Sequence, residues 1–244
     1  MKRFMLALVC LVIATMAGSA CAYTINDAIG DRIGNLPFEL YGIDISQSGS
    51  TLTFDIFSNF DGAETVTSWT VLPADLALSL NNDNSYEYGV ALTTHDAVLA
   101  GGLYRVNTGV NTTGYSSGTY NDILNGWYTS DHFAPSHQSG IGHIYNENQP
   151  VQIASIIGGA LSAGSVSMFG PESSVPLYRY SVTFDASPIF ADPNYSGSFN
   201  VYYGLATCAN DYVSGSYAPV PEPGTMSLLG IGLLGLLGFR KKKK

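Results

Sequence analysis

The sequence predicts an all-β protein: a two-sheet antiparallel β-sandwich of jelly-roll-like type, flanked by a signal peptide and a short C-terminal membrane segment. Three observations lead to this prediction. Apolar and polar residues alternate over many short stretches, no long stretch has apolar residues at helical spacing, and turn-forming residues interrupt the chain repeatedly. Short strands with one apolar and one polar face pack most readily as two antiparallel sheets.

The clearest strand lies over residues 51–56, where every second residue is apolar. The same alternation predicts strands over residues 178–184 and 199–205. Weaker alternation predicts further strands over residues 65–72, 86–92, 102–107, 151–156 and 165–169. Turn-forming residues separate these stretches at Ser48-Gly49, Asn81 to Asn84 and Ser187-Pro188.

Residues 23–219 are expected to form one domain, because their number suits a single hydrophobic core. Within this domain, residues 108–150 are rich in Gly, Ser, Asn and Tyr and show little alternation. A stretch this long without strand signals predicts a long surface insertion.

The N-terminal residues 1–22 have the three parts of a signal peptide: Lys2 and Arg3, an apolar stretch, and the small-residue site Ala20-Cys21-Ala22. This order predicts export and cleavage by signal peptidase before Tyr23, with Ala20 and Ala22 as the recognised small residues. The alternative is a lipoprotein with lipid on Cys21, although Gly18 stands where leucine is usual.

The C-terminal residues 220–244 begin with V-P-E-P-G-T, continue as an apolar run from Met226 to Phe239, and end in Arg240 and four lysines. The fourteen apolar residues would cover roughly 21 Å as a helix, less than the ~30 Å hydrocarbon core. The basic block is expected to stay cytoplasmic, which leaves the preceding residues outside. Pro221, Glu222 and Pro223 are then extended at the outer surface, where a processing enzyme can reach them.

This order of parts resembles the PEP-CTERM tail, a sorting signal for exosortase-type transpeptidases of Gram-negative bacteria. The resemblance covers about a tenth of the chain and is specific because all three parts stand in order. It implies processing at Pro221, Glu222 and Pro223, transient inner-membrane anchoring, and display at the cell surface or in the extracellular matrix. The alternative is an ordinary C-terminal anchor that is never cut.

The body is also similar to extracellular regions that often precede this tail. The fragments that carry this similarity are Tyr86 to Asp96, Ile144 to Asn148 and Ala206 to Asp211. This second resemblance implies an exported surface protein with no established activity, and it supplies no catalytic residues.

Between the two signals the chain is strongly acidic. Residues 23–219 hold three arginines, no lysine and eighteen acidic side chains, a net charge of −15. Such a surface repels phosphates, which excludes nucleic acid as a partner. Cys208 is the single cysteine of this region, so no disulfide forms within it, and the residue is expected to be a small buried hydrophobe.

Acidic and amide side chains could supply oxygen ligands for a structural calcium ion. Asp27 and Asp31 bracket a glycine-containing turn, Asn81 to Asn84 form a second turn, and Asn210-Asp211 follow the last predicted strand. No stretch has the spacing of an EF-hand, and these residues are also ordinary turn formers. The sequence therefore leaves both calcium and its ligands open.

The chain has four histidines that could take part in chemistry. His132, His137 and His143 stand near Asp131, but their spacing matches no known zinc site, so solvent-facing loop histidines are expected. His95-Asp96 invites comparison with hydrolases, yet the chain lacks a G-x-S-x-G motif. We therefore expect no enzymatic activity.

Aromatic residues in the 108–150 stretch suggest a contact with glycans, since exposed rings can stack on sugar faces. The candidates are Tyr120, Trp127 and Tyr128. Two functions follow from the sequence. The first is an exported surface or matrix protein with a structural or interaction role, and the alternative is a carbohydrate-binding module with calcium-stabilised loops that contacts extracellular polysaccharide.

Overall fold

The computed structural model describes residues 22–32, 38–66, 69–81, 83, 85–113, 115–116, 119–120, 122–133, 148–171, 177–207 and 209–218. Ala22–Ala218 form one compact unit. The predicted signal-peptide residue Ala20, the sorting residues Pro221, Glu222 and Pro223, and Cys208 lie outside the described residues.

The first large sheet has the strand order β1-β2-β3-β15-β14, and every neighbouring pair is antiparallel. Its strands are β1 (Ala22–Asn26), β2 (Leu40–Ser48), β3 (Thr51–Ser58), β15 (Tyr178–Asp185) and β14 (Gly164–Phe169). The central pairing joins β3 to β15 over their whole length, from Thr51 opposite Asp185 to Ser58 opposite Tyr178.

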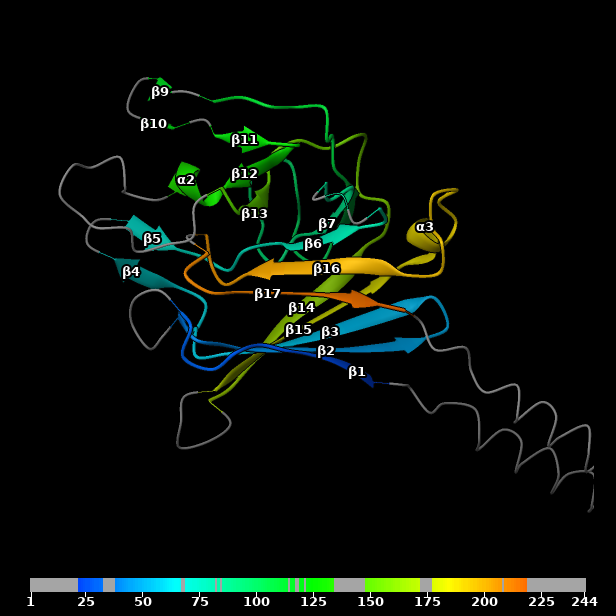
Figure 1. The fold of residues 1–244 in the computed structure, drawn as a ribbon, viewed down its shortest axis with the longest axis horizontal. Coiled ribbons are helices and arrows are strands. Elements are labelled where there is room, and N and C mark those ends of the chain that lie inside the picture. The colour runs from blue at the N-terminus through cyan, green and yellow to red at the C-terminus, as the bar shows by residue number, and fades with distance from the viewer. Residues whose placement is uncertain are drawn as a thin grey trace, which may run out of the picture. The chain divides into compact units, whose positions relative to one another are not determined.

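The second large sheet has the order β17-β16-β6-β7-β8 and is also antiparallel throughout. Its strands are β17 (Tyr212–Tyr217), β16 (Phe199–Gly204), β6 (Leu76–Ser79), β7 (Tyr88–Val90) and β8 (Leu103–Arg105). Figure 1 shows β16 and β17 lying over β2 and β3, so the two sheets face each other as the layers of a sandwich.

The main hydrophobic core fills the space between these two layers. Leu52, Phe54 and Ile56 of β3 are fully buried, whereas the residues between them are partly exposed. Val201 and Tyr203 of β16 enter the same core from the opposite sheet. The alternation in β3 therefore has the physical cause expected of a half-buried strand, with one face in the core and one in water.

A third, smaller sheet covers the outer face of the second sheet (Figure 1). It consists of β11 (Ile123–Leu124), β12 (Trp127–Thr129) and β13 (Pro150–Ile153). Trp127 and Ile153 pack there against Ala77 and Tyr202. A Cβ atom added at Gly89 would lie 2.7–2.8 Å from these Ile153 and Trp127 side chains, so glycine lets the layers approach.

The remaining elements are short. They are the hairpin strands β4 (Glu64–Val66), β5 (Trp69–Val71), β9 (Tyr115–Ser116) and β10 (Thr119–Tyr120), and the helices α2 (Ser130–Phe133) and α3 (Ser187–Phe190).

The prediction of an all-β antiparallel sandwich is confirmed. All three clearly alternating stretches form strands, β3, β15 and β16. Residues 65–72 were expected to form one strand, but they contribute to the β4–β5 hairpin. Residues 108–150 were expected to be a surface insertion, yet part of them forms β11 and β12 and buries Trp127. Strands β1, β2, β6, β9, β10 and β17 were not predicted either.

The compact unit holds both large sheets and the core between them, so it contains the contacts needed to fold without its flanking segments. Residues 22–218 produced alone should therefore be soluble and give a β-type circular dichroism spectrum with one cooperative thermal transition. A spectrum with substantial helix, or a gradual melt, would contradict the sandwich.

Candidate functional site

Three carboxylates from distant parts of the chain meet where the loop after β1 approaches the turn before β17. They belong to Asp27, Asp31 and Asp211, and one oxygen of each lies within 4.8 Å of the others. Asp211 is buried, Asp27 is half-buried and Asp31 is exposed. The cluster is therefore open to solvent on one side.

Backbone hydrogen bonds fix the two less exposed members of the cluster. The Leu40 and Tyr212 amides donate to the two carboxylate oxygens of Asp211, at 2.8 and 2.9 Å. The Asp27 amide donates to the Tyr41 carbonyl at 3.3 Å. Asp211 thus ties the final hairpin to the beginning of β2, and Asp27 continues the β1–β2 ladder.

A fourth acid, Glu39, lies beside the cluster and has its own partners. Its side chain is 1% exposed, and it accepts hydrogen bonds from the Gly30 amide and from Arg32. Arg32 forms its ion pair with Glu39. The arginine next to the cluster therefore balances Glu39, while the three aspartates repel one another.

Burial, together with the negative charges of Asp211 and Asp31, raises the pKa of Asp27 to about 7. Burial also raises the pKa of Asp211 to about 6, with Asp31 and Glu39 adding to the effect against the Leu40 and Tyr212 amides, which lower it. In addition, Oδ2 of Asp27 is buried and accepts no hydrogen bond. A cation shared by the carboxylates would relieve both problems.

The donor set suits a hard cation. All three side chains offer oxygen, which calcium prefers, and none offers the nitrogen or sulfur typical of zinc sites. Calcium takes six to eight oxygens, so backbone carbonyls or water would have to complete the shell.

The other candidate calcium turn is organised differently. Asn81 donates its side-chain amide to Glu87 at 3.0 Å, and Asp83 accepts the Ser85 amide at 3.0 Å. These contacts are those of a turn stabilised by its own side chains. Asn82 and Asn84 lie outside the described residues.

His95 binds a buried carboxylate that the sequence analysis did not identify. Its Nε2 lies 2.8 Å from Asp75 Oδ2, and its Nδ1 lies 3.5 Å from Asp96. Asp75 is fully buried and also accepts the Leu92 and Ile153 amides, at 3.0 and 2.9 Å. Burial lowers the pKa of His95, but the bond to Asp75 and the charges of both aspartates raise it above its usual value. The sequence signal for this buried carboxylate was the position of Asp75 within the apolar stretch Leu72 to Leu80.

The remaining histidines are not brought together within the described residues. His132 packs its ring against Tyr128, with 4.3 Å between centroids, and against Phe133 at 4.6 Å. His137, His143 and the side chain of Asp131 lie outside the described residues. The aromatic neighbours of His132 favour a packing role.

The predicted glycan residue Trp127 is buried rather than displayed. Its ring is 1% exposed, and Nε1 donates to the Tyr86 carbonyl at 3.0 Å. Neither ring face is open for a sugar to stack on, which corrects the expectation of an exposed platform. Tyr128 is half-buried against His132, and Tyr120 lies in β10 with a side chain outside the described residues.

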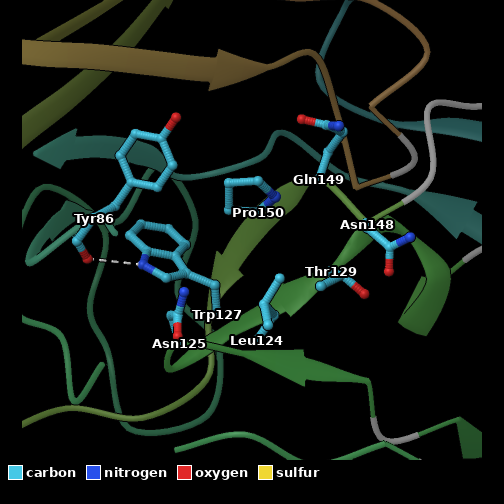
Figure 2. A pocket seen from close by; sticks show the side chains of 8 residues that line it. All are labelled: Tyr86, Leu124, Asn125, Trp127, Thr129, Asn148, Gln149 and Pro150. Atoms are coloured by element: carbon cyan, nitrogen blue, oxygen red, sulfur yellow. Dashed lines mark hydrogen bonds between the residues drawn. The ribbon is translucent and has the colours of Figure 1, made fainter. Parts of the chain in front are cut away.

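Trp127 instead forms part of the wall of a cavity of about 310 Å³ (Figure 2). The cavity is lined by Tyr86, Leu124, Asn125, Trp127, Thr129, Asn148, Gln149 and Pro150. Figure 2 shows the amide side chains and the Tyr86 ring arranged around the Pro150 ring. Amides combined with aromatic and apolar surface can bind a small polar, uncharged ligand.

The chain ends in a segment that known proteins share. Residues 219–243 match the family model of the PEP-CTERM protein-sorting motif. The chain carries a PEP-CTERM sorting motif. No curated protein and no solved structure matches the chain.

This match confirms the resemblance of the C-terminal residues to a PEP-CTERM tail, and it includes Pro221, Glu222 and Pro223. It implies an exported protein that exosortase processes. In the part of the chain that the structure describes, no helix is long and apolar enough to cross a membrane. The predicted membrane segment, Met226 to Phe239, lies outside that part.

The raised pKa of Asp27 predicts how stability depends on pH. When a chelator keeps calcium away, protonation of Asp27 favours the folded state. This contribution to stability is complete below about pH 4 and is lost as the pH rises through about 7. Calcium should reverse the loss, and it should act more strongly at neutral than at acidic pH because protons compete for the carboxylates. Calcium at about 100 times the Kd of the site would add about 2.7 kcal/mol to the free energy of unfolding.

Thermal unfolding of residues 22–218, with calcium and with chelator, checks this prediction. Asp27→Asn should raise the chelator Tm at neutral pH by about 3 °C or more and remove the calcium effect. The matched control is Asp83→Asn, in the other candidate turn, which should leave both unchanged. A calcium response that persists in Asp27→Asn would contradict the assignment.

Proposed function

We propose that this protein is displayed at the cell surface or in the extracellular matrix, where its sandwich has a structural or interaction role. The PEP-CTERM motif carries this proposal, because it implies an exported protein that exosortase processes. In the proposed sequence of events, signal peptidase cuts after Ala22, the C-terminal segment holds the precursor in the inner membrane, and exosortase then processes the tail.

The geometry of the body supports a non-catalytic role. Both ring nitrogens of His95 face carboxylates, of Asp75 and Asp96, so the ring is poorly placed to accept a proton from a nucleophile. Asp75 is fully buried and satisfies backbone amides. This arrangement is that of a structural ion pair within the core.

Calcium is proposed as a structural ion at Asp27, Asp31 and Asp211. The support comes from their three converging oxygens and the buried, unpartnered Oδ2 of Asp27. The ion would join the loop after β1 to the turn before β17, and so connect the first and last strands of the body. Such a link would stabilise the ends of the domain that adjoin the two sorting signals.

The alternative function is carbohydrate binding, and the cavity beside Trp127 favours it. A volume of about 310 Å³ is small, and its amide lining can hydrogen-bond sugar hydroxyls. The proposed ligand is a neutral sugar unit of the extracellular polysaccharide, because an acidic protein repels acidic glycans. Contact would occur at the cavity rather than by stacking on Trp127.

Exosortase processing is tested at the glutamate of the motif. Glu222→Ala in the full chain should leave export intact and cause uncut precursor to accumulate in the membrane fraction. Intact mass and membrane fractionation measure this outcome. The matched control is Glu172→Ala, because Pro171-Glu172 is the other Pro-Glu pair in the chain. Normal processing of Glu222→Ala would contradict the role given to the motif.

Carbohydrate binding is tested at the cavity wall. Leu124 is 48% exposed, so Leu124→Arg should obstruct the cavity without disturbing the core. Retention of residues 22–218 on the producer's own polysaccharide should then fall about tenfold or more. Leu72→Arg, at a residue 38% exposed and outside the cavity lining, is the control and should bind normally. Equal retention of both variants, or no retention of the unmodified body, would contradict carbohydrate binding at the cavity and leave the structural or interaction role as the remaining proposal.

A further inference from the structure

Strand β14 is an open edge of the first sheet. It pairs with β15 on one side, and no described strand pairs with its other side. Five of its six residues are exposed, and Val166 is partly buried. Alternate residues of such a strand present unpaired N–H and C=O groups outward, which is the surface that another strand can extend.

The edge of the second sheet at β8 is occupied. Residues 156–162 run along β8, where the Ile157 and Leu161 amides donate to the Arg105 and Leu103 carbonyls at 2.9 and 2.8 Å. Strand β17 packs against β1 and β2 through contacts that include Tyr217 with Gln47. Five of the six residues of β14 are exposed, against three of six in β17, so β14 is the more open of these two edges.

Exposed apolar side chains lie on β14 and on the two segments that adjoin its start. The large hydrophobic side chains that are 40–66% exposed there are Leu99, Ile157, Leu161, Met168 and Phe169. The backbones of Gly101 and Gly164 lie in contact, since a Cβ at Gly101 would be 2.7 Å from Gly164. This contact places the loop of Leu99 beside the start of β14, and the segment of Ile157 and Leu161 leads directly into it.

The edge also lacks the charges that usually protect one. Residues 153–171 contain no Asp, Glu, Lys or Arg, whereas residues 23–219 as a whole have a net charge of −15. Arg179 lies at the end of the strand, with its guanidinium carbon 4.6 Å from the centre of the Phe169 ring. Edge strands of monomeric proteins normally carry lysine, proline or a bulge, and Ser165 to Phe169 have no lysine or proline.

We propose that β14 pairs with β14 of a second copy of this chain, antiparallel and across a two-fold axis. Two acidic molecules repel over most of their surfaces, so they can approach most closely where each is uncharged. An antiparallel pair of identical strands is self-complementary, as a two-fold interface requires. The two five-stranded sheets then become one continuous ten-stranded sheet.

The surrounding apolar residues give this interface its area. A stable interface buries roughly 800 Å² on each partner, more than one six-residue strand provides. Met168 and Phe169 lie on the strand, and Leu99, Ile157 and Leu161 flank it. Pairing the edges would bring these side chains of both copies together and remove them from water.

Sedimentation velocity of residues 22–218, from micromolar to hundreds of micromolar, tests this proposal. The body should dimerise, and Ser167→Asp should weaken dimerisation about tenfold or more, because it places two like charges beside the axis. Ser214→Asp is the matched control: it puts the same charge at an exposed serine of β17, the edge strand of the other sheet. Melting temperatures of both variants equal to that of the unmodified body would show that the fold is intact.

A body that stays monomeric at every concentration would overturn the proposal. A dimer that Ser167→Asp and Ser214→Asp leave equally strong would also overturn it, because the interface would then lie elsewhere. Neither result depends on exosortase, calcium or polysaccharide, so the proposed function can fail or stand separately from this interface.

Discussion

The second sheet is covered on both faces, by the first sheet on one side and by β11, β12 and β13 on the other, and each polar group inside it needs a partner within the protein. Asp75 is the clearest case. Its fully buried carboxylate accepts hydrogen bonds from the Leu92 and Ile153 amides and from His95 Nε2. The backbone amide of Asp75 donates to the Val151 carbonyl at 2.7 Å. These bonds connect the second and third layers, and removing one partner of such a buried pair costs about 3–5 kcal/mol.

The same constraint explains which strands the sequence could predict. Strand β3 has one face in water, so its burial alternates and the sequence shows the period of two. All four residues of β6 are buried, because the third layer covers its outer side, and its apolar run carries no alternation. The prediction of an exposed Trp127 was wrong for a related reason. Its sequence neighbours are mostly polar or glycine, and only the fold shows that it packs against the second sheet.

The candidate sites were predictable to different degrees. The sorting motif depends on the order of residues along the chain, so the sequence sufficed. Asp27, Asp31 and Asp211 were each recognisable as turn acids, but 180 residues or more separate the first two from the third, and their meeting depends on strand pairing. The roles of Glu39 and Asp75 required the structure, since an acid's local sequence says little about the partner that balances it.

The long-range pairing at the centre of the first sheet also limits when an exported chain can fold. Strand β3 must wait for β15, more than a hundred residues later, and Asp211 must reach Leu40 before the final hairpin can dock. A chain synthesised from its N-terminus therefore cannot complete its central ladder until β15 has been made. Most of the domain is therefore synthesised before its sheets can be completed. The last strand, β17, is made only a few residues before the apolar run that begins at Met226.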